Sequence, residues 1–570
     1  MKKIIIFSLL LIMTCLTSCD SNKPGNLGVV DLKYYDQTGE QGYNQELFYR
    51  NDLLATGADP FCLYVTEGEY AGYFFMYNTS DEINGNGYMC WKSKDLTNWE
   101  FESICYVPDD RSWSWTGLWA PSVIYDQEMG KYLLFYSGTN INPEYSNCKH
   151  IGVAVSDSPA GPFIQYTTPE GETNLNGDVI EIDDPLFLFE DMENDGTYNT
   201  GEPFKNVKTG LIDAFPFVDP QTGDKYLYMV RTRTDHDTNV IVGVKMKDWF
   251  SPDYSTYTQL TQVNVTNVFG TEKTEITEGT INEAPNVIYY KDRYYLTCSV
   301  NATTDANYSI IQAVGDSPLG PFTKIQASQG GLVLGADVSW DHVACCGSHD
   351  FVYDGEDLWI VYHQNRDKDA LVLERGIAAD RITWVKNADG LPLLKAVGPT
   401  YSVQPLPTSY TGYSNLAPKA KITATNMLEG SSVNYLNDSL VRFQMTDIVE
   451  EFKGKDVVTI TLSFDDYVTA RSLLIYNSYD YYSTFYQVAR IDFGFRKVVD
   501  GKECVGTARV ENLYYDLETY SQIQYEIMRP GAPLIIEFDE LEINSVTITI
   551  ACPSGQEDFA ISEIMLMGKE

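Results

Sequence analysis

Three carboxylic acids in this sequence stand at the entrance to short apolar runs. Asp59 precedes "PFCLYV", Asp213 lies within "IDAFPF", and Glu283 lies within "NEAPNVIYY". A carboxylate at the mouth of an apolar strand costs free energy unless it is solvated, paired or neutralised. Each acid taken singly also fits a turn, a strand end or a rim position. Together, such acids can hydrolyse a glycosidic bond, because one protonates the departing oxygen while another activates water or attacks carbon, and a third can keep the pKa of the proton donor high.

The elements that would position these acids form a repeat. Segments that begin at Ala58, Ala120, Asp213, Glu283 and Ser348 each read as a short strand, a Gly- or Asp-containing turn and an aromatic-rich second strand. Two of the third strands end in near copies of one tail, "SDSPAGPF" and "GDSPLGPF". Five copies at intervals of about 60 to 90 residues predict an all-β fold that begins with a five-bladed β-propeller.

The first strand of each propeller blade lines the central axis, so residues at the same point in several blades converge there. We therefore expect Asp59, Asp213 and Glu283 to face one cavity, with Ala120 and His349 contributed by blades two and five. A purely structural repeat favours a small or apolar residue at this point, as Ala120 illustrates. Three acids at one level of the repeat therefore indicate chemistry.

The composition limits the class of ligand. The chain has 570 residues, of which 44% are hydrophobic and 13% aromatic, and its formal net charge is −40. This length predicts more than one domain, and the apolar share is enough for a full core. The negative charge disfavours nucleic acid and anionic membrane surfaces as partners. A secreted protein that handles neutral or weakly charged ligands fits these numbers.

The N-terminus predicts export and a lipid anchor. Lys2 and Lys3 precede an apolar run over residues 4–12, which is too short to span a bilayer as a mature helix. The sequence "LTSC" that ends at Cys19 matches a bacterial lipobox, with cleavage before Cys19 and acylation of its thiol; an ordinary signal peptide is the alternative. We expect a signal over residues 1–19, a linker over 20–45, and a periplasmic or cell-surface protein that contacts the membrane only through its lipid.

A second domain follows the repeat. The propeller is predicted over residues 46–405 and a β-sandwich over 415–570, where alternating runs such as "VVTITLSF" and "SVTITI" appear. The segments "NLAPKAKITATN" and "FAISEIMLMGKE" resemble the discoidin-like (galactose-binding-like) jelly roll. A tyrosine group in this domain either binds sugar or packs on the strand surface; its members are Tyr479, Tyr481, Tyr482 and Tyr486.

The propeller motifs resemble glycoside hydrolase family 43 over about residues 50 to 400. The resemblance rests on Asp59-Pro60, "WAPSV" from residue 119, "IDAFPFVD" from residue 212, "EAPN" from residue 283, and the two tails. It implies a five-bladed propeller that inverts the configuration at the anomeric carbon. By this resemblance Asp59 is the general base, Glu283 the general acid, and Asp213 the residue that tunes and orients the acid. Ala284 stands where the family more often has glycine, which is a mild departure.

The same resemblance suggests further site residues. His349 matches a histidine that coordinates an ion or water on the axis, and Arg375 matches an arginine that holds the sugar. Trp115 and Trp119 lie where a sugar-stacking platform is often found, although a place in the core fits them equally well. An inverting mechanism also requires the two catalytic carboxyl groups to stand roughly 6.5–9.5 Å apart, which leaves room for the attacking water.

An independent motif suggests calcium. In "DMENDGTYNTGE", oxygen-bearing residues fall at positions 1, 3, 5 and 12 of an EF-hand-type loop, with a turn glycine at position 6. The four side chains are Asp191, Glu193, Asp195 and Glu202. The flanks do not read as two helices, and a solvated acidic turn is the alternative. A bound Ca²⁺ would brace the long excursion between blades two and three, and no cofactor is needed for the chemistry.

These observations predict an exo-acting, inverting glycosidase for plant cell-wall oligo- or polysaccharide. The expected leaving unit is a terminal pentose, α-L-arabinofuranose first, with β-xylosidase or galactofuranosidase activity as alternatives. A surface lipoprotein that binds glycan without hydrolysing it is the alternative from another class. The presence of all three acids argues against that alternative.

Overall fold

The structure is a computed structural model of the 570-residue chain. It describes residues 32–35, 42–51, 53, 57–79, 86–142, 148–186, 209–233, 238–336, 343–365, 375–443, 448–499, 501–514, 518–519, 526–527 and 531–569. The predicted lipobox at Cys19 and the predicted calcium loop 191–202 lie outside these residues. Within the described ranges, no helix is long and apolar enough to cross a membrane.

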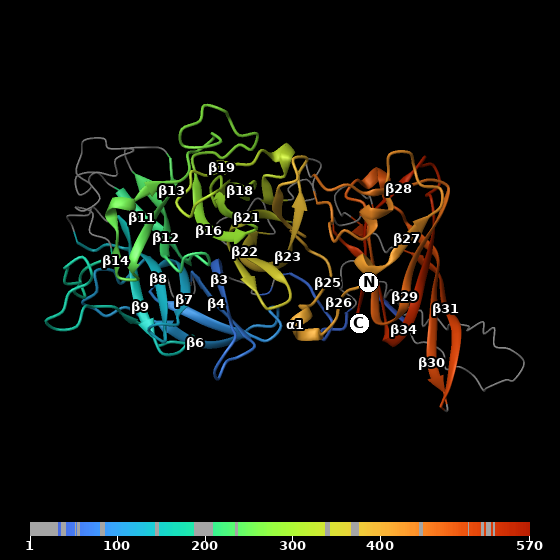
Figure 1. Cartoon of the computed structure of the whole chain (residues 1–570), viewed down its shortest axis with the longest axis horizontal. Coiled ribbons are helices and arrows are strands. Elements are labelled where there is room, and N and C mark those ends of the chain that lie inside the picture. The colour runs from blue at the N-terminus through green and yellow to red at the C-terminus, as the bar shows by residue number, and fades with distance from the viewer. Residues whose placement is uncertain are drawn as a thin grey trace, which may run out of the picture. The chain divides into compact units, whose positions relative to one another are not determined.

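The chain divides into two compact units. One comprises Asn51–Pro399 with Thr446–Ile448 and is called the propeller unit below. The other comprises Met1–Arg50, Thr400–Met445 and Val449–Glu570 and is called the β-sheet unit. Both are built almost entirely from strands, so the predicted all-β fold is confirmed (Figure 1).

The propeller unit contains five antiparallel sheets, each formed from consecutive strands (Figure 1). Blade one is β3 Ala58–Val65, β4 Tyr73–Thr79, β5 Tyr88–Ser93 and β6 Glu100–Tyr106; blade two is β7 Trp119–Asp126, β8 Lys131–Thr139, β9 Lys149–Ser156 and β10 Ile164–Gln165; blade three is β11 Thr209–Val218, β12 Lys225–Arg233, β13 Val240–Asp248, β14 Ser251–Pro252 and β15 Thr258–Gln259; blade four is β16 Asn282–Tyr290, β17 Arg293–Val300, β18 Ser309–Gly315, β19 Thr323–Lys324 and β20 Leu332–Leu334; blade five is β21 Ala344–Tyr353, β22 Leu358–Asn365, β23 Gly376–Lys386 and β24 Pro392–Ala396. The predicted five-bladed propeller is confirmed.

The five innermost strands close into a ring. Each of β3, β7, β11, β16 and β21 contacts the next, and β21 contacts β3. The chain that enters blade one seals this last junction, because the backbone N–H groups of Leu53 and Gly57 each donate to blade-five carbonyls at 3.0 Å. The Asn51 side chain adds a bond to the Asp380 carboxylate at 3.2 Å. Closing the ring pairs or covers strand edges that would otherwise attract other chains.

The blades pack through apolar faces and through the repeated tails. Separate apolar clusters join blades one and two, two and three, and three and four. The tails add a repeated polar contact between neighbouring blades. Tyr77 in β4 donates its hydroxyl to the Pro159 carbonyl at 2.6 Å, and Tyr228 in β12 donates to the Pro318 carbonyl at 2.8 Å. The near-identical tails therefore accept a buried tyrosine hydroxyl from the preceding blade, which leaves that polar group satisfied.

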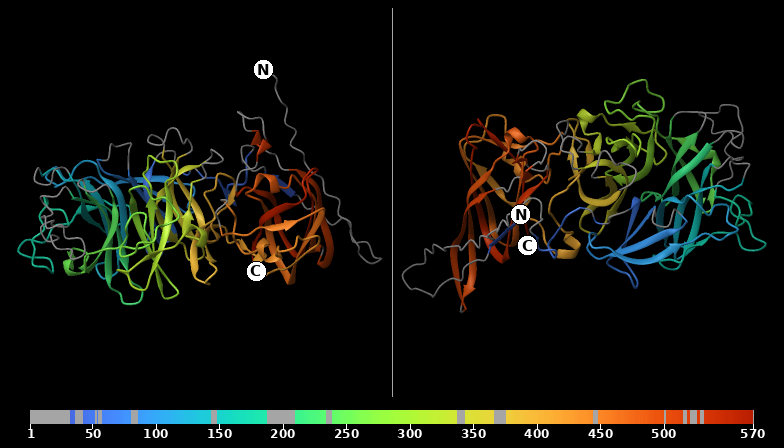
Figure 2. Two further views of the ribbon diagram at one scale, coloured as in Figure 1. Left: turned by 90° about the horizontal axis from the view of Figure 1, so that it is seen from above. Right: turned by 180° about the vertical axis from the view of Figure 1, so that it is seen from behind.

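The β-sheet unit, largely orange and red in Figure 2, contains one sheet of nine strands, and its longest strand pairing is interrupted by register shifts. Its strands are β1 Leu32–Tyr35, β26 Ser414–Asn415, β27 Lys421–Ala424, β28 Phe452–Gly454, β29 Val457–Asn477, β30 Gln487–Val499, β31 Lys502–Tyr514, β34 Pro533–Ala551 and β35 Phe559–Lys569. The pairs β2 Phe48–Tyr49 with β25 Gln404–Pro405 and β32 Glu518–Thr519 with β33 Glu526–Ile527 stand apart, and α1 Thr408–Thr411 is the α-helix of the described residues. Tyr479 of the predicted tyrosine group is buried, whereas Tyr482 is 80% exposed.

The N-terminal segment belongs to this second unit. The stretch predicted as a linker contains β1, which pairs with β34 in antiparallel register. Glu537 of β34 is buried and anchors the segment, because its carboxylate accepts hydrogen bonds from Tyr35 and from the Asn44 amide at 2.9 Å. Arg471 supplies the balancing charge at 2.7 Å. Strands β2 and β25 also fall in this unit, although the sequence placed both in the propeller.

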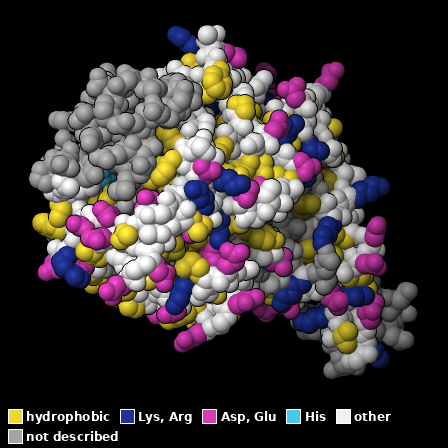
Figure 3. All heavy atoms as spheres, turned by 60° about the vertical axis from the view of Figure 1, so that its left-hand side comes forward, with side chains coloured by type: hydrophobic (Ala, Val, Ile, Leu, Met, Phe, Trp, Pro, Cys, Tyr) yellow, Lys and Arg dark blue, Asp and Glu magenta, His cyan; other side chains and the backbone are white. Residues whose placement is uncertain are grey.

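The surface shows how the large negative charge is accommodated. Acidic and basic side chains are interspersed over the described part of the face in Figure 3. Interspersed charges limit local repulsion, so a formal net charge of −40 does not require one strongly acidic patch on this face.

Candidate active site

Every blade carries the same irregularity in its innermost strand. The pairing with the second strand skips two residues, after Ala58, Trp119, Ile212, Glu283 and Gly347. In each gap the first skipped residue has a positive φ: Asp59 (48°), Ala120 (41°), Asp213 (56°), Ala284 (50°) and Ser348 (49°). A residue other than glycine is strained when its backbone adopts the left-handed conformation. Such a bulge re-aims side chains, and five of them in one ring direct side chains toward the axis.

This register corrects the alignment of the acids. Asp59 and Asp213 occupy the left-handed position itself, but Glu283 lies one residue earlier, at the position of Trp119 in blade two. His349 lies one residue after the left-handed position in blade five. The glutamate side chain is one methylene longer than aspartate, so it reaches toward the axis from a different backbone position.

The strained residues are held by bonds between blades. Each left-handed N–H donates to the preceding blade: Asp59 to His363 Nδ1 (3.3 Å), Ala120 to Thr79 Oγ1 (2.9 Å), Asp213 to Ser137 Oγ (2.9 Å), Ala284 to Asp213 Oδ2 (3.1 Å) and Ser348 to Ser299 Oγ (2.9 Å). Four acceptors come from one second-strand position. Blade three has Val230 there, which offers no acceptor, and the Asp213 carboxyl group takes over. Asp213 is thereby fixed beside the backbone that carries Glu283.

Asp59 is held as a carboxylate. The Thr79 hydroxyl donates to its Oδ2 at 2.7 Å, and Arg375 Nη1 and His363 Nδ1 stand 3.8 Å and 3.6 Å from its Oδ1. Burial alone would raise the pKa of Asp59, but interactions with His363, Arg375 and Thr79 lower this pKa well below its usual range. The side chain remains 17% exposed, so water can reach it.

Glu283 is held in the opposite state. Burial, supplemented by the negative charge of Asp59, raises the pKa of Glu283 to about 7, although a hydrogen bond from Tyr308 opposes the shift. The Tyr308 hydroxyl donates to Glu283 Oε1 at 2.8 Å. The Tyr308 ring stacks on His363 with centroids 5.6 Å apart and planes 7° from parallel. Gly347 makes room for this ring, since a Cβ there would lie 2.1 Å from it.

Asp213 and Lys149 complete the charged groups. Burial and the nearby charges of Glu283 and Asp59 raise the pKa of Asp213 well above its usual range. Burial lowers the pKa of Lys149 to about 8, against the opposing charge of Asp213. The Lys149 ammonium donates to the Gly117 carbonyl and to Thr139 Oγ1, and lies 3.4 Å from the centroid of the Trp119 ring.

The two predicted platform tryptophans are accessible. Trp115 is 50% exposed and Trp119 is 45% exposed, so neither is a core residue. Because Trp119 shares the bulge position of Glu283, it is presented to the axis by the same backbone device. Lys149 covers part of the indole and holds it in place.

His349 does not assemble a metal centre with its described neighbours. Its Nε2 is 2.7 Å from Thr297 Oγ1, while the buried Nδ1 has no hydrogen-bond partner. Burial lowers the pKa of His349 to about 3, so the ring is neutral. No group of three or more His, Cys, Asp or Glu side chains suited to a metal occurs among the described residues. The predicted axial ion therefore stays a prediction that rests on one orphan nitrogen.

Four site residues were missed from the sequence: Thr79, Lys149, His363 and Tyr308. Thr79 and His363 lie in the second strands of blades one and five, each paired with the residue just before the bulge, and Ser137 and Ser299 hold the same position in blades two and four. An alignment of the second strands would have revealed this column of polar residues. Tyr308 precedes β18 and shows no repeat signal.

A five-bladed propeller whose innermost strands carry a carboxylate, two carboxyl groups of raised pKa and the exposed Trp119 indole fits a glycoside hydrolase that acts on O-glycosyl bonds. The chain belongs to glycosyl hydrolases family 43, whose model matches residues 49–195 and 183–392.

Known proteins similar to this chain share parts of it. A β-xylosidase from Xylanibacter ruminicola is 24% identical over 265 residues, which cover 45% of this chain and 68% of that protein. A β-D-galactofuranosidase from Aspergillus niger is 30% identical over 121 residues, covering 21% of this chain and 34% of that protein. A solved α-L-arabinofuranosidase structure from Lactobacillus brevis has a TM-score of 0.43 at 18% identity, covering 60% of this chain and 95% of the other.

Proposed function

We propose that the protein is an inverting exo-glycosidase that releases terminal pentose, α-L-arabinofuranose first, from plant polysaccharide side chains. One observation carries this proposal: Asp59 and Glu283 interact electrostatically, yet their surroundings shift their pKa values in opposite directions. Near pH 6 Asp59 is therefore a carboxylate and Glu283 is a carboxylic acid. A pair of this kind is what general base and general acid catalysis requires at a single pH.

The roles follow from the surroundings of each group. Asp59 would take a proton from the attacking water, since its charge is stabilised by Thr79 and Arg375. Glu283 would protonate the departing glycosidic oxygen. Asp213 would keep Glu283 in place through the N–H of Ala284 and hold the acid's pKa high when it is itself ionised. An inverting reaction requires the two catalytic carboxyl groups roughly 6.5–9.5 Å apart.

The substrate rests on weaker support than the reaction. The similar galactofuranosidase is named for a furanose ring, which supports the arabinofuranoside. The similar β-xylosidase supports a β-xyloside as second candidate. Both substrates would use the same three acids, so a side-by-side comparison of aryl α-L-arabinofuranoside, β-D-xyloside and β-D-galactofuranoside separates them.

The experiment combines that comparison with two variants. Asp59→Ala is expected to lower kcat/KM on every leaving group alike, because the base acts on water. Glu283→Ala is expected to lower kcat/KM most for the poorest leaving group, because a good leaving group needs no proton. NMR of the first-formed sugar should show inversion. Turnover like that of the parent in either variant refutes the site. If the parent hydrolyses none of the substrates but still binds glycan, the result favours the non-catalytic lipoprotein.

Two further proposals concern residues outside the described ranges. Lipid anchoring at Cys19 predicts that Cys19→Ser moves the protein from the membrane fraction to the soluble fraction. Calcium binding at Asp191–Glu202 predicts that a chelator lowers the melting temperature of the intact chain and that Asp195→Ala abolishes the difference.

A further inference from the structure

A hollow of about 380 Å³ lies on the propeller unit, toward the end of β3 that is farther from Asp59. Asp59 is near the start of β3, whereas the hollow is lined by residues 63–70 at the end of β3 and the turn that follows. At a rise of about 3.3 Å per residue, the lining residues of β3 lie about 13 Å (Leu63) to about 20 Å (Val65) along the strand from Asp59. Residues 125–132 of blade two and the turn at 157–159 complete the wall.

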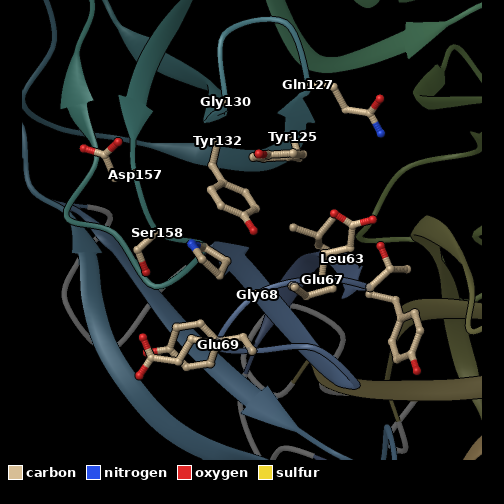
Figure 4. Close-up of a pocket in the computed structure, with 15 residues that line it drawn as sticks. Leu63, Glu67, Gly68, Glu69, Tyr125, Gln127, Gly130, Tyr132, Asp157 and Ser158 are labelled. Carbon is tan, nitrogen blue, oxygen red and sulfur yellow. The ribbon is translucent and has the colours of Figure 1, made fainter.

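Aromatic rings from two blades face this hollow. Tyr125 is 44% exposed, and its ring centroid lies 4.7 Å from that of Tyr132. Figure 4 shows these two rings on one side of the hollow and Leu63 and Glu67 on the other. Tyr64 and Tyr70 also contribute to the wall. An exposed ring such as Tyr125 beside partly buried rings at a concave site is what the apolar C–H face of a sugar packs against, and the volume lies within the range of ligand pockets.

The polar groups at the rim restrict the ligand further. Glu67 and Glu69 are exposed, and neither forms an ion pair with a described residue. Asp157 is ion-paired with Lys131. Free carboxylates accept hydrogen bonds from sugar hydroxyls and repel anionic sugars such as uronates. A metal ion fits poorly, because the described residues include no cluster of three His, Cys, Asp or Glu side chains suited to one.

We propose that this hollow is an ancillary binding site for a neutral segment of the polysaccharide substrate. This inference rests on the proposed function for the identity of the polymer. Because the site is remote from the acids, it holds the polymer without touching the bond that is cleaved. A second attachment point raises the local concentration of chain ends at the acids, so polymers gain from it and small glycosides do not.

The experiment measures polymer retention apart from hydrolysis. The background is the full chain with Glu283→Gln, and retention is measured by affinity electrophoresis in soluble arabinoxylan. Tyr125→Ala is expected to weaken retention about fivefold or more, and Glu67→Gln to weaken it less. The matched control is Tyr353→Ala, since Tyr353 is 61% exposed at the end of β21 and does not line the hollow. Each substitution is also made in the parent, where kcat/KM on the aryl glycoside reports on the fold and the acids.

The outcomes separate this site from the proposed function. Retention that falls with Tyr125→Ala but not with Tyr353→Ala supports the site, even if no aryl glycoside is hydrolysed and the proposed function fails. Equal retention in Tyr125→Ala and its parent overturns the site, even if hydrolysis is confirmed. No retention in the Glu283→Gln background also overturns it.

Discussion

Removing one hydroxyl from Tyr308 tests how the proposed acid is tuned. The Tyr308 hydroxyl donates to Glu283 Oε1 at 2.8 Å, and the ring stacks on His363. Tyr308→Phe keeps the ring, its stacking and its fit against Gly347, and deletes the hydroxyl with its hydrogen bond to Glu283 and its bond with Ser299. A hydrogen bond to a charged group contributes about 1.5–3 kcal/mol, and one pKa unit corresponds to about 1.36 kcal/mol. The substitution should therefore shift the Glu283 pKa by about 1 to 2 units.

The direction of the shift follows from which form of Glu283 the bond favours. A donor stabilises the carboxylate, so it lowers the pKa of Glu283, and its loss raises that pKa further above about 7. The proposed acid works only when protonated. The alkaline limb of kcat/KM should therefore move about one unit or more toward higher pH. Asp59, whose pKa lies well below its usual range, stays ionised throughout.

The assay is the pH profile of kcat/KM from about pH 4 to 10 on an aryl glycoside, with Tyr353→Phe as control. Tyr353 donates its hydroxyl to the Gly355 carbonyl at the surface, so its loss should leave the profile unchanged. An alkaline limb that stays in place or moves to lower pH in Tyr308→Phe would show that Glu283 is not the group whose deprotonation ends activity. A shift of equal size in the control would indicate a general effect of the substitution.

Three further predictions concern the groups around the acids. Lys149→Met removes the cation that lies 3.4 Å from the centroid of the Trp119 ring and holds this ring in place. KM should therefore rise severalfold while kcat stays nearly unchanged. Steady-state kinetics that show a fall in kcat alone would contradict this prediction. Asp213→Asn keeps an acceptor for the Ala284 N–H, so it should lose activity yet melt near the parent, whereas Asp213→Ala should also lower the melting temperature by a few degrees. Equal melting temperatures of the two variants would show that the bond from Ala284 to Asp213 does not hold the blades together. Gly347→Ala places a Cβ 2.1 Å from the Tyr308 ring. It should lower the free energy of unfolding by about 1–3 kcal/mol and also lower kcat. A variant that melts and turns over like the parent would show that the Tyr308 ring does not pack against Gly347.

Much of the propeller follows from sequence because each blade repeats a local pattern. Strand, turn and aromatic-rich strand recur five times, and local alternation is visible in residue types. The same approach placed Glu283 in one column with Asp59 and Asp213, which is wrong by one residue. The left-handed positions hold Asp, Ala, Asp, Ala and Ser, so side-chain type does not reveal the bulge that sets the register.

The pairing of each acid with its partner was beyond local pattern, although the column that holds Thr79 and His363 is visible once the second strands are aligned. Tyr308 comes from the segment before β18, and the bond from Asp59 to His363 spans 304 residues of sequence. Strand β1 was missed for a related reason. It has four residues, and its pairing with β34 depends on a partner near the other end of the chain. Contacts of this kind are created by the folded unit rather than by the segment itself.

The pairing of β1 with β34 has a consequence for the order of synthesis. Tyr35 and its acceptor Glu537 are 502 residues apart, so at about 5–20 residues per second the ribosome needs about 25–100 s to make the second after the first. The propeller unit, which lies between them in sequence, is complete before this partner exists. One of the first strands to be made is therefore among the last to be placed, and until then the nascent chain carries an unpaired strand that must be kept from other chains.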